Sequence, residues 1–193
     1  MKRASIIDNF ERKGITFEEK EKQLILASFQ TIHLKKKEYI LNAGEICDFQ
    51  AFVVKGCCKV YFLDNQGQEH IIYFAVEDWW LADLESYHFS LPSKFYIQAI
   101  EDCELLWISK EVKEPLYKEI PVLERVYRLM LGQECIALQR RIMNKLSMDA
   151  TTEYEDFCKR YPSLLKRLTN IQIASYLGIS QEFLSKIRSK KRI

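Results

Sequence analysis

The segment that most constrains the fold lies near the C-terminus, at residues 168–188. Ile171, Ala174 and Tyr176–Leu177 give a first short helix one apolar face, and Gly178 then interrupts the pattern. Glycine readily adopts the left-handed backbone conformation that ends many helices. We therefore expect a tight turn at this glycine.

A second short helix is predicted directly after the turn. Ser180 is a natural N-cap for a helix that begins at Gln181. We expect Phe183, Leu184 and Ile187 to form its inner face. Two helices joined in this way make a helix-turn-helix, whose second helix enters the major groove of DNA, although two ordinary core helices also fit the pattern.

Polar residues on this helix pair favour the DNA interpretation. Those expected to point outward from the second helix carry donors and acceptors suited to base edges or phosphates: Gln181, Glu182, Ser185, Lys186 and Arg188. Thr169 and Asn170, at the start of the first helix, are predicted to contact a phosphate. Lys190, Lys191 and Arg192 are expected to add affinity with little selectivity.

The charge distribution agrees with a polyanion partner for the C-terminal part alone. Residues 1–120 contain 15 basic and 20 acidic residues, whereas residues 121–193 contain 14 basic and 7 acidic residues. A run of basic residues is often only a solvated surface, but here it coincides with the predicted helix pair.

The composition fits an ordinary globular protein. At 193 residues with 48% hydrophobic content, the chain can bury a proper core as one large or two small domains. We find no apolar run long enough for a transmembrane helix and no secretory signal at the N-terminus, so we expect a cytoplasmic location.

Cysteine and histidine spacing does not predict a metal site or an enzyme. The six cysteines are Cys47, Cys57, Cys58, Cys103, Cys135 and Cys158, and no pair has zinc-ligand spacing. We expect mostly buried, reduced thiols, with a redox-sensing role as the alternative. Because no nucleophile–base pair or phosphate loop is visible either, we predict no enzymatic activity and no cofactor.

The N-terminal two thirds of the chain changes from helical to strand-like patterning and back. Residues 1–30 have a helical pattern, and residues 32–109 contain short apolar runs separated by glycine turns, which is typical of an antiparallel barrel or sandwich. After Pro121, a helical segment extends to Ser147. Its apolar residues suggest a coiled-coil-like seam through Val122, Val126, Leu129, Gln133, Ile136, Arg140 and Met143. This seam packs either on the same chain or, as we favour, on a second copy.

This order of elements resembles the Crp/Fnr family of bacterial transcription regulators. The matching residues are Asn42–Asp48, Phe52–Gly56, Lys59–Phe62, Asp64–Gly67 and Cys103–Ser109. The resemblance implies a cyclic-nucleotide-binding-like β-roll, a dimerisation helix and a DNA-binding helix-turn-helix, in which Gln181, Glu182 and Lys186 are the main base readers. It also implies double-stranded DNA with an inverted repeat, a second copy of the chain, and RNA polymerase as partners.

The chain departs from the family pattern where the family binds a cyclic phosphate. That site has a Gly-Glu segment followed by an Arg-Ser pair, but residues 78–95 contain no glycine, and Ser93–Lys94 stand where the pair is expected. Lysine lacks the bidentate fork of arginine, so we predict that cyclic AMP and cyclic GMP do not bind. For a different small effector, the resemblance places the pocket at Trp80, Asp83, Ser93 and Lys94.

Two other family features are missing from this sequence. No cysteine precedes Cys47, so an iron–sulfur oxygen sensor is not implied. The sequence stops at Ile193 without the β-hairpin wing that often follows the second helix, and we expect the basic residues near the C-terminus to supply more of the contacts to the DNA backbone.

The sequence therefore predicts an α+β protein in three parts. These are an N-terminal antiparallel β-roll or jelly-roll barrel with flanking helices at 1–120, a long dimerisation helix at 121–147, and an all-α helix-turn-helix domain at 148–193. The predicted function is a homodimeric, sequence-specific DNA-binding regulator. The alternative is a small-molecule-binding signalling module whose helix-turn-helix contacts proteins.

Overall fold

The computed structural model of the protein describes residues 4–191, with the backbone alone for Ala4 and Lys191. The chain divides into two compact units. The first comprises Met1–Phe62 and Ile72–Leu131, and the second comprises Leu63–Ile71 and Gly132–Ile193. The division falls inside the long helix, and a hairpin tip from the strand region belongs to the second unit. Arg192, for which we expected a phosphate contact, lies outside the described residues.

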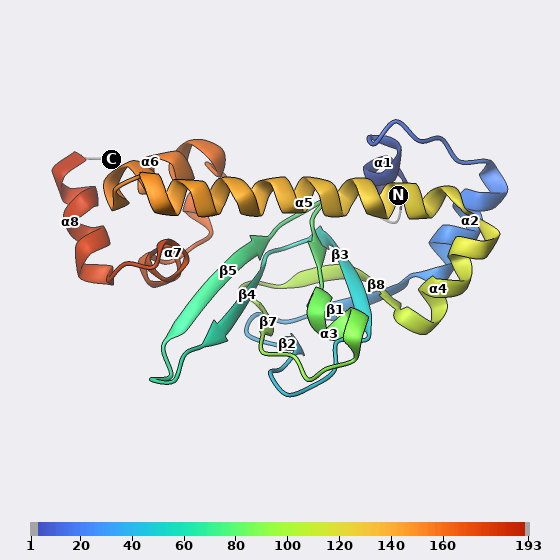
Figure 1. Ribbon diagram of the computed structural model, residues 1–193, viewed down its shortest axis with the longest axis horizontal. Helices are drawn as coiled ribbons and strands as arrows, with labels where there is room; N and C mark the ends of the chain where they lie inside the picture. The colour runs from blue at the N-terminus through green and yellow to red at the C-terminus, as the bar shows by residue number, and fades with distance from the viewer. Residues whose placement is uncertain (1–3, 192–193) are drawn as a thin grey trace. The chain divides into compact units, whose positions relative to one another are not determined.

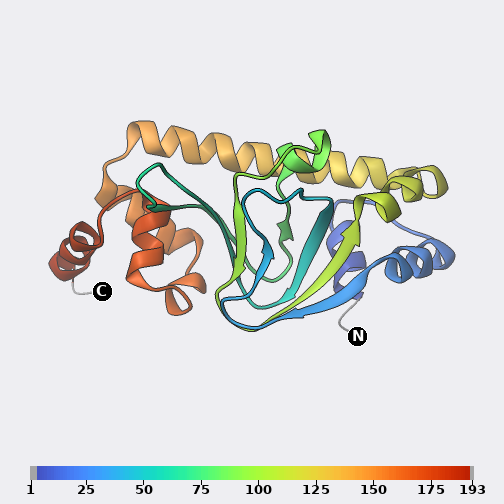
Figure 2. The ribbon, with the colours of Figure 1, turned by 90° about the horizontal axis from the view of Figure 1, so that it is seen from below.

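Two antiparallel sheets of four strands form most of the first unit (Figure 1). The strands are β1 (Gln30–Leu34), β2 (Tyr39–Leu41), β3 (Phe49–Lys55), β4 (Cys58–Leu63), β5 (Glu69–Ala75), β6 (Trp80–Leu81), β7 (Tyr96–Ala99) and β8 (Cys103–Ser109). One sheet has the order β1-β8-β3-β6 and the other β2-β7-β4-β5. Figure 2 shows β1 (blue) beside β8 (yellow-green). In this antiparallel pair, Gln30 lies opposite Trp107. The predicted antiparallel β architecture is confirmed.

The space between the two sheets is filled by a hydrophobic cluster. Leu41, Val60 and Ile97 come from one sheet, and Ala51 and Leu105 from the other. Alternate residues of each strand face this interior, as the side-chain period of a β-strand requires. Four of the cysteines are buried, in agreement with the expectation of mostly buried thiols.

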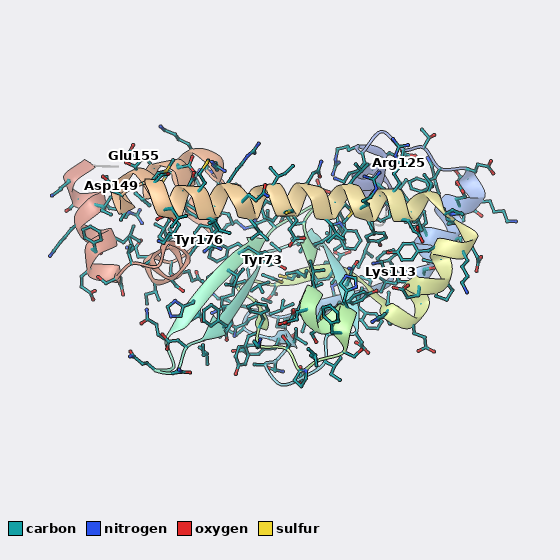
Figure 3. The ribbon with its side chains drawn as sticks, in the orientation of Figure 1. Tyr73, Lys113, Arg125, Asp149, Glu155 and Tyr176 are labelled. Atoms are coloured by element: carbon teal, nitrogen blue, oxygen red, sulfur yellow. The ribbon has the colours of Figure 1, made fainter. Side chains whose placement is uncertain are left out.

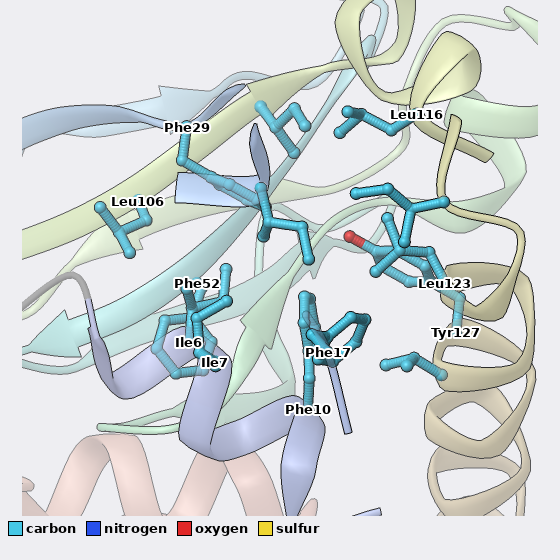
Figure 4. Close-up of a cluster of buried hydrophobic side chains, with 14 of the residues drawn as sticks. Ile6, Ile7, Phe10, Phe17, Phe29, Phe52, Leu106, Leu116, Leu123 and Tyr127 are labelled. Atoms are coloured by element: carbon cyan, nitrogen blue, oxygen red, sulfur yellow. The ribbon is translucent and has the colours of Figure 1, made fainter. Parts of the chain in front are cut away.

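Helices cover the other face of the first sheet. They are α1 (Ala4–Glu11), α2 (Glu19–Ser28), α4 (Lys110–Glu119) and the first part of α5 (Val122–Ser147). Their apolar faces pack with Phe52 and Leu106 of the sheet in a second cluster, which includes Phe10 and Tyr127 (Figure 4). The long helix has the bounds expected from the sequence.

Three short helices follow α5 in the second unit. They are α6 (Ala150–Arg160), α7 (Asn170–Leu177) and α8 (Gln181–Lys191), with a 3-10 turn at Leu164–Lys166 between the first two. Asp149 caps α6, and its side chain accepts a hydrogen bond from the Thr152 backbone N–H at 2.8 Å. Among the described residues, no helix is long and apolar enough to cross a membrane.

One segment contains two elements that the sequence analysis did not predict. Residues 78–95 include strand β6 and helix α3 (Leu84–Phe89). Both elements are short, and Asp78 and Ser90 adopt positive φ angles of 70° and 54° on either side of them. Elements of this length do not produce a readable periodicity.

Candidate functional site

The first candidate site is the segment that contains α3, because it corresponds to the family's phosphate-binding region. Asp83 caps α3, and its carboxylate accepts hydrogen bonds from the backbone N–H groups of Glu85 and Ser86 at 3.1 and 3.3 Å. The Ser93 hydroxyl donates to the other carboxylate oxygen of Asp83 at 2.7 Å. Asp83 and Ser93 are both 4% exposed. The helix amides that an anion would use are therefore occupied by a buried carboxylate.

Three neighbouring hydrogen bonds hold this segment further. The Ser86 hydroxyl accepts from the Cys47 backbone N–H at 2.8 Å and donates to the Leu91 carbonyl at 2.6 Å. The Tyr73 hydroxyl donates to the Ala82 carbonyl at 3.4 Å, so the ring of Tyr73 (labelled in Figure 3) extends to the chain just before Asp83. The segment is thus held by hydrogen bonds among its own residues and by hydrogen bonds from Cys47 and Tyr73.

The structure brings two of the four residues expected in an effector pocket, Asp83 and Ser93, into contact. Lys94 follows Ser93, but its exposed ammonium lies 3.5 Å from the Glu85 carboxylate. Trp80 does not join them, which corrects the expectation. Its ring stacks on Phe10, with ring centroids 5.8 Å apart, and its centroid lies 5.3 Å from that of Phe52. Trp80 therefore belongs to the cluster between the helices and the first sheet.

A buried lysine behind α3 is the main feature of this unit that the sequence analysis missed. The Lys113 ammonium donates to Gln50 Oε1 at 2.9 Å and lies 3.8 Å from the centre of the Tyr127 ring. The rings of Tyr87 and Tyr117 are 5.2 and 5.3 Å away, which completes an aromatic cage around the ammonium labelled in Figure 3. One signal was available, because Lys113 stands three residues before Leu116 and so lies on the apolar face of α4.

Burial determines the protonation behaviour of this cage. Loss of hydration lowers the pKa of Lys113 to about 8, and the attraction of Glu114 offsets only part of this effect. Burial also raises the pKa values of Tyr87, Tyr117 and Tyr127. The side chains of the cage come from α3, α4, α5 and β3, and they surround an ammonium whose pKa is lowered.

The second candidate site is the α7–α8 pair. Gly178 ends α7 in the left-handed conformation, with φ at 63°, and its N–H donates to the Ala174 and Ser175 carbonyls. The Ser180 hydroxyl accepts from the Phe183 backbone N–H at 3.1 Å. Leu177, Leu184 and Ile187 are buried. The predicted turn and N-cap are both present.

Two apolar residues of this pair do not lie where the sequence pattern placed them. Ile171 is 62% exposed and Phe183 is 47% exposed. The inner face consists of Ile173, which the sequence pattern did not include, together with four residues that were expected there, Ala174, Leu177, Leu184 and Ile187. Neighbouring residues of a helix point in different directions, so the apolar residues of these helices of 8 and 11 residues cannot all face inward. The sequence alone does not decide which of them are buried.

Most of the predicted DNA-contacting residues are exposed on α8. This group consists of Gln181, Glu182, Ser185, Lys186 and Lys190. Hydrogen bonds from its own backbone N–H and from the Ser180 hydroxyl lower the pKa of Glu182, which favours an ionised acceptor. Arg188 is half-buried, and its guanidinium donates to Asn170 Oδ1. These two residues, both expected to contact DNA, therefore contact each other and hold α8 against the start of α7.

Helix α7 is held at both ends. Thr169 caps its N-terminus, where the Thr169 hydroxyl accepts from the Gln172 N–H and Gln172 Oε1 accepts from the Thr169 N–H. At its C-terminus, Arg141 of α5 donates to the Tyr176 carbonyl at 2.9 Å and Lys145 donates to the Leu177 carbonyl. Cations at these carbonyls also complement the helix dipole.

The hairpin tip of the second unit contacts α7 through one serine. The Ser175 hydroxyl donates to the Glu69 carbonyl at 2.6 Å and accepts from the Ile71 N–H at 3.1 Å. Arg141 also donates to the Ile71 carbonyl at 3.2 Å, and its guanidinium lies 4.3 Å from the centre of the Tyr176 ring (labelled in Figure 3). Sequence reasoning identified neither Ser175 nor Arg141, because these contacts join positions far apart in the chain.

Comparison with known proteins gives a family match in the N-terminal part of the chain. Residues 31–119 match the model of the cyclic nucleotide-binding domain. None of the curated proteins matches the sequence.

Solved structures resemble the chain over nearly its whole length. The c-di-GMP-responsive global regulator CLP of Xanthomonas campestris has a TM-score of 0.72 at 14% identity, with 91% of this chain and 92% of that chain covered. A CooA mutant from Carboxydothermus hydrogenoformans has a TM-score of 0.72 at 17% identity, with 94% and 83% covered. A protein from Eubacterium rectale assigned to the Crp/Fnr family has a TM-score of 0.71 at 21% identity, with 95% and 88% covered. The resemblance expected from the sequence is therefore confirmed: residues 31–119 match the cyclic nucleotide-binding domain family, and the chain has the fold of the Crp/Fnr transcription regulators.

Proposed function

We propose that the protein is a sequence-specific DNA-binding transcription regulator that acts as a homodimer. The observation that carries the proposal is the exposed polar face of α8, a helix fixed through α7 to the end of α5 by Arg141 and Lys145. A helix held in this way can present the same side chains to every half-site. The fold and the basic charge of residues 121–193 support the same function.

In the proposed complex, α8 enters the major groove with its N-terminal residues toward the bases. Glu182 accepts from a cytosine amino group, Lys186 donates to guanine, and Gln181 contacts an adjacent base. Ser185 and Arg188 lie farther along the helix, and we assign to Arg188 mainly the positioning of α8 through Asn170. Thr169 at the start of α7 and Lys190 contact phosphates, and the side chain of Lys191 lies outside the described residues.

The proposed dimer contact is an apolar stripe on α5. Exposed residues at successive intervals of three or four positions form it: Leu131, Cys135, Leu138, Ile142 and Leu146. The first part of the seam expected from the sequence is covered, because Val126 is buried in the first unit and Leu129 packs against the same cluster, whereas Ile136 and Met143 of that seam are exposed. A partly exposed apolar row on a long helix favours pairing with the same row of a second copy.

Cys135 allows the dimer contact to be tested without an added probe. Mild oxidation of the purified protein is expected to link two copies through Cys135, because the same position of each copy would face the other. A Cys135→Ser variant should lose the cross-link, and Cys158→Ser should keep it. A wild-type protein that remains monomeric at micromolar concentration and never cross-links would contradict the dimer.

We propose that cyclic AMP and cyclic GMP are not effectors of this protein. Support comes from the Asp83 carboxylate, which occupies the N-terminal amides of α3 and would repel a phosphate. A different small effector would have to open the Asp83–Ser93 contact. Neither cyclic nucleotide should raise the thermal unfolding midpoint, and a saturable rise with either one would refute this part.

Lys186 provides the direct test of base reading. On a selected DNA site, Lys186→Ala is expected to weaken specific binding by about 1–3 kcal/mol and to affect random DNA much less. Lys166→Ala, which removes a basic residue outside α8, serves as the control. An unchanged ratio of specific to non-specific affinity would remove Lys186 from the base readers, and selection of no motif would favour a protein-contact role for the helix pair.

A further inference from the structure

Phe183 occupies an unexpected position on α8. Within the described part of this helix it is the only large apolar side chain that remains exposed, since Leu184 and Ile187 are buried. Successive residues of a helix are rotated by about 100°, so residues three and seven positions after Phe183 lie on the same side of the helix. These residues are Lys186 and Lys190, both exposed.

The backbone fixes Phe183 in the first turn of α8. Its N–H donates to the Ser180 hydroxyl at 3.1 Å, as the third residue of a capped helix does. In a helix that enters the major groove, the residues of the first turn meet the base edges. The Phe183 ring thus lies at the edge of the surface formed by Glu182 and Lys186.

Only one group in the major groove of ordinary DNA is apolar, and this is the C5-methyl of thymine. Lys186 and Lys190, which follow Phe183 on the same side of the helix, attract this surface to DNA, and the phenyl ring has no polar atom to satisfy there. We propose that Phe183 is a specificity-determining residue that packs on a thymine methyl group in each half-site. This inference rests on the proposed DNA-binding function.

The ring would also fit an apolar pocket on another protein. The observations favour DNA because the exposed neighbours of Phe183 on the same side are two lysines, and because the segment from Arg160 onward has 8 basic residues and one acidic residue. A surface of this charge suits a polyanion better than an apolar partner.

The test uses the full-length protein and a DNA site obtained by selection from a random pool. Each thymine of the site is replaced singly by deoxyuridine, which removes the C5-methyl group and nothing else. For the wild type, we expect one thymine per half-site at which this replacement weakens binding about threefold to fivefold, the effect of one buried methyl group. In Phe183→Ala, the thymine and uracil sites should bind equally.

Two further variants separate a specific contact from a general loss of structure. Phe183→Leu keeps an apolar side chain and should retain part of the discrimination between thymine and uracil. Ile171→Ala removes the other exposed apolar residue of the helix pair and should leave the discrimination unchanged. Circular dichroism and the thermal midpoint establish that each variant is folded.

The outcomes distinguish this inference from the proposed function. A selected motif without any uracil-sensitive thymine, or with the same sensitivity in Phe183→Ala, would overturn the role of Phe183 and leave DNA binding intact. Failure of the wild type to select any motif would overturn both. Loss of discrimination only in Phe183→Ala, with partial retention in Phe183→Leu, would establish the contact.

Discussion

Because the ammonium of Lys113 is buried, the free energy of unfolding of the protein is expected to rise with pH. The pKa of this lysine falls from 10.5 to about 8 on folding. One pKa unit corresponds to about 1.4 kcal/mol, so the buried charge costs the folded state about 3 kcal/mol when both states are protonated. We predict that Lys113→Met removes this cost and the pH dependence that comes with it.

The sign follows from proton binding. Between the folded and unfolded pKa values, the unfolded chain holds a proton that the folded chain has released, so the free energy of unfolding rises with pH. From about pH 7 to about pH 9.5 the expected rise is about 2 kcal/mol in the wild type. Tyr87, Tyr117 and Tyr127 have raised pKa values and act in the opposite direction at higher pH, so the measurement stops below their range.

Urea unfolding at several pH values measures this effect. The wild-type curve is compared with Lys113→Met and with Lys118→Met, a control that removes an exposed charge from the same helix. Subtracting the Lys113→Met curve from the wild-type curve should give a difference that increases by about 2 kcal/mol over this pH window. At neutral pH, Lys113→Met also loses the hydrogen bond to Gln50, which offsets part of the increase in the free energy of unfolding that comes from removing the buried charge. Parallel curves for the wild type and Lys113→Met would contradict a lowered pKa of Lys113 in the folded protein.

Three other substitutions test individual contacts. Gly56→Ala should destabilise the first unit by more than about 2 kcal/mol in urea unfolding, because φ is +101° and the new Cβ would lie 2.6 Å from Cys103 Sγ. Ser93→Ala leaves Asp83 without one buried donor and should lower the free energy of unfolding by about 1–3 kcal/mol, whereas a neutral result would mean that water replaces the hydroxyl. Ser175→Ala should speed hydrogen exchange at the Ile71 amide, measured by mass spectrometry, and unchanged exchange would show that this contact does not protect the strand.

The sequence predicted the larger elements because their signals are long or chemically distinctive. The long helix after Pro121 has no further proline and ends as expected at Ser147. Gly178 and Ser180 marked the turn and the cap of the α7–α8 pair because few residue types suit those positions.

The remaining features depend on tertiary contacts that local pattern does not encode. Trp80 and Asp83 are three residues apart, yet one packs under the helices and the other caps α3. Arg188 was expected at DNA because of its charge, and only the structure shows its contact with Asn170. Lys113 is buried although lysine is seldom buried, so its residue type argued against its actual position.

In the proposed function, the exposed face of α8 reads DNA in a two-fold arrangement. Selection of binding sites from a random DNA pool by the purified full-length protein is the experiment that examines this arrangement. We expect an inverted repeat whose half-site centres are about 34 Å apart, roughly one helical turn, and which Lys186→Ala binds about 1–3 kcal/mol more weakly. Recovery of no motif, or of a single unrepeated site bound equally well by Lys186→Ala, would contradict it.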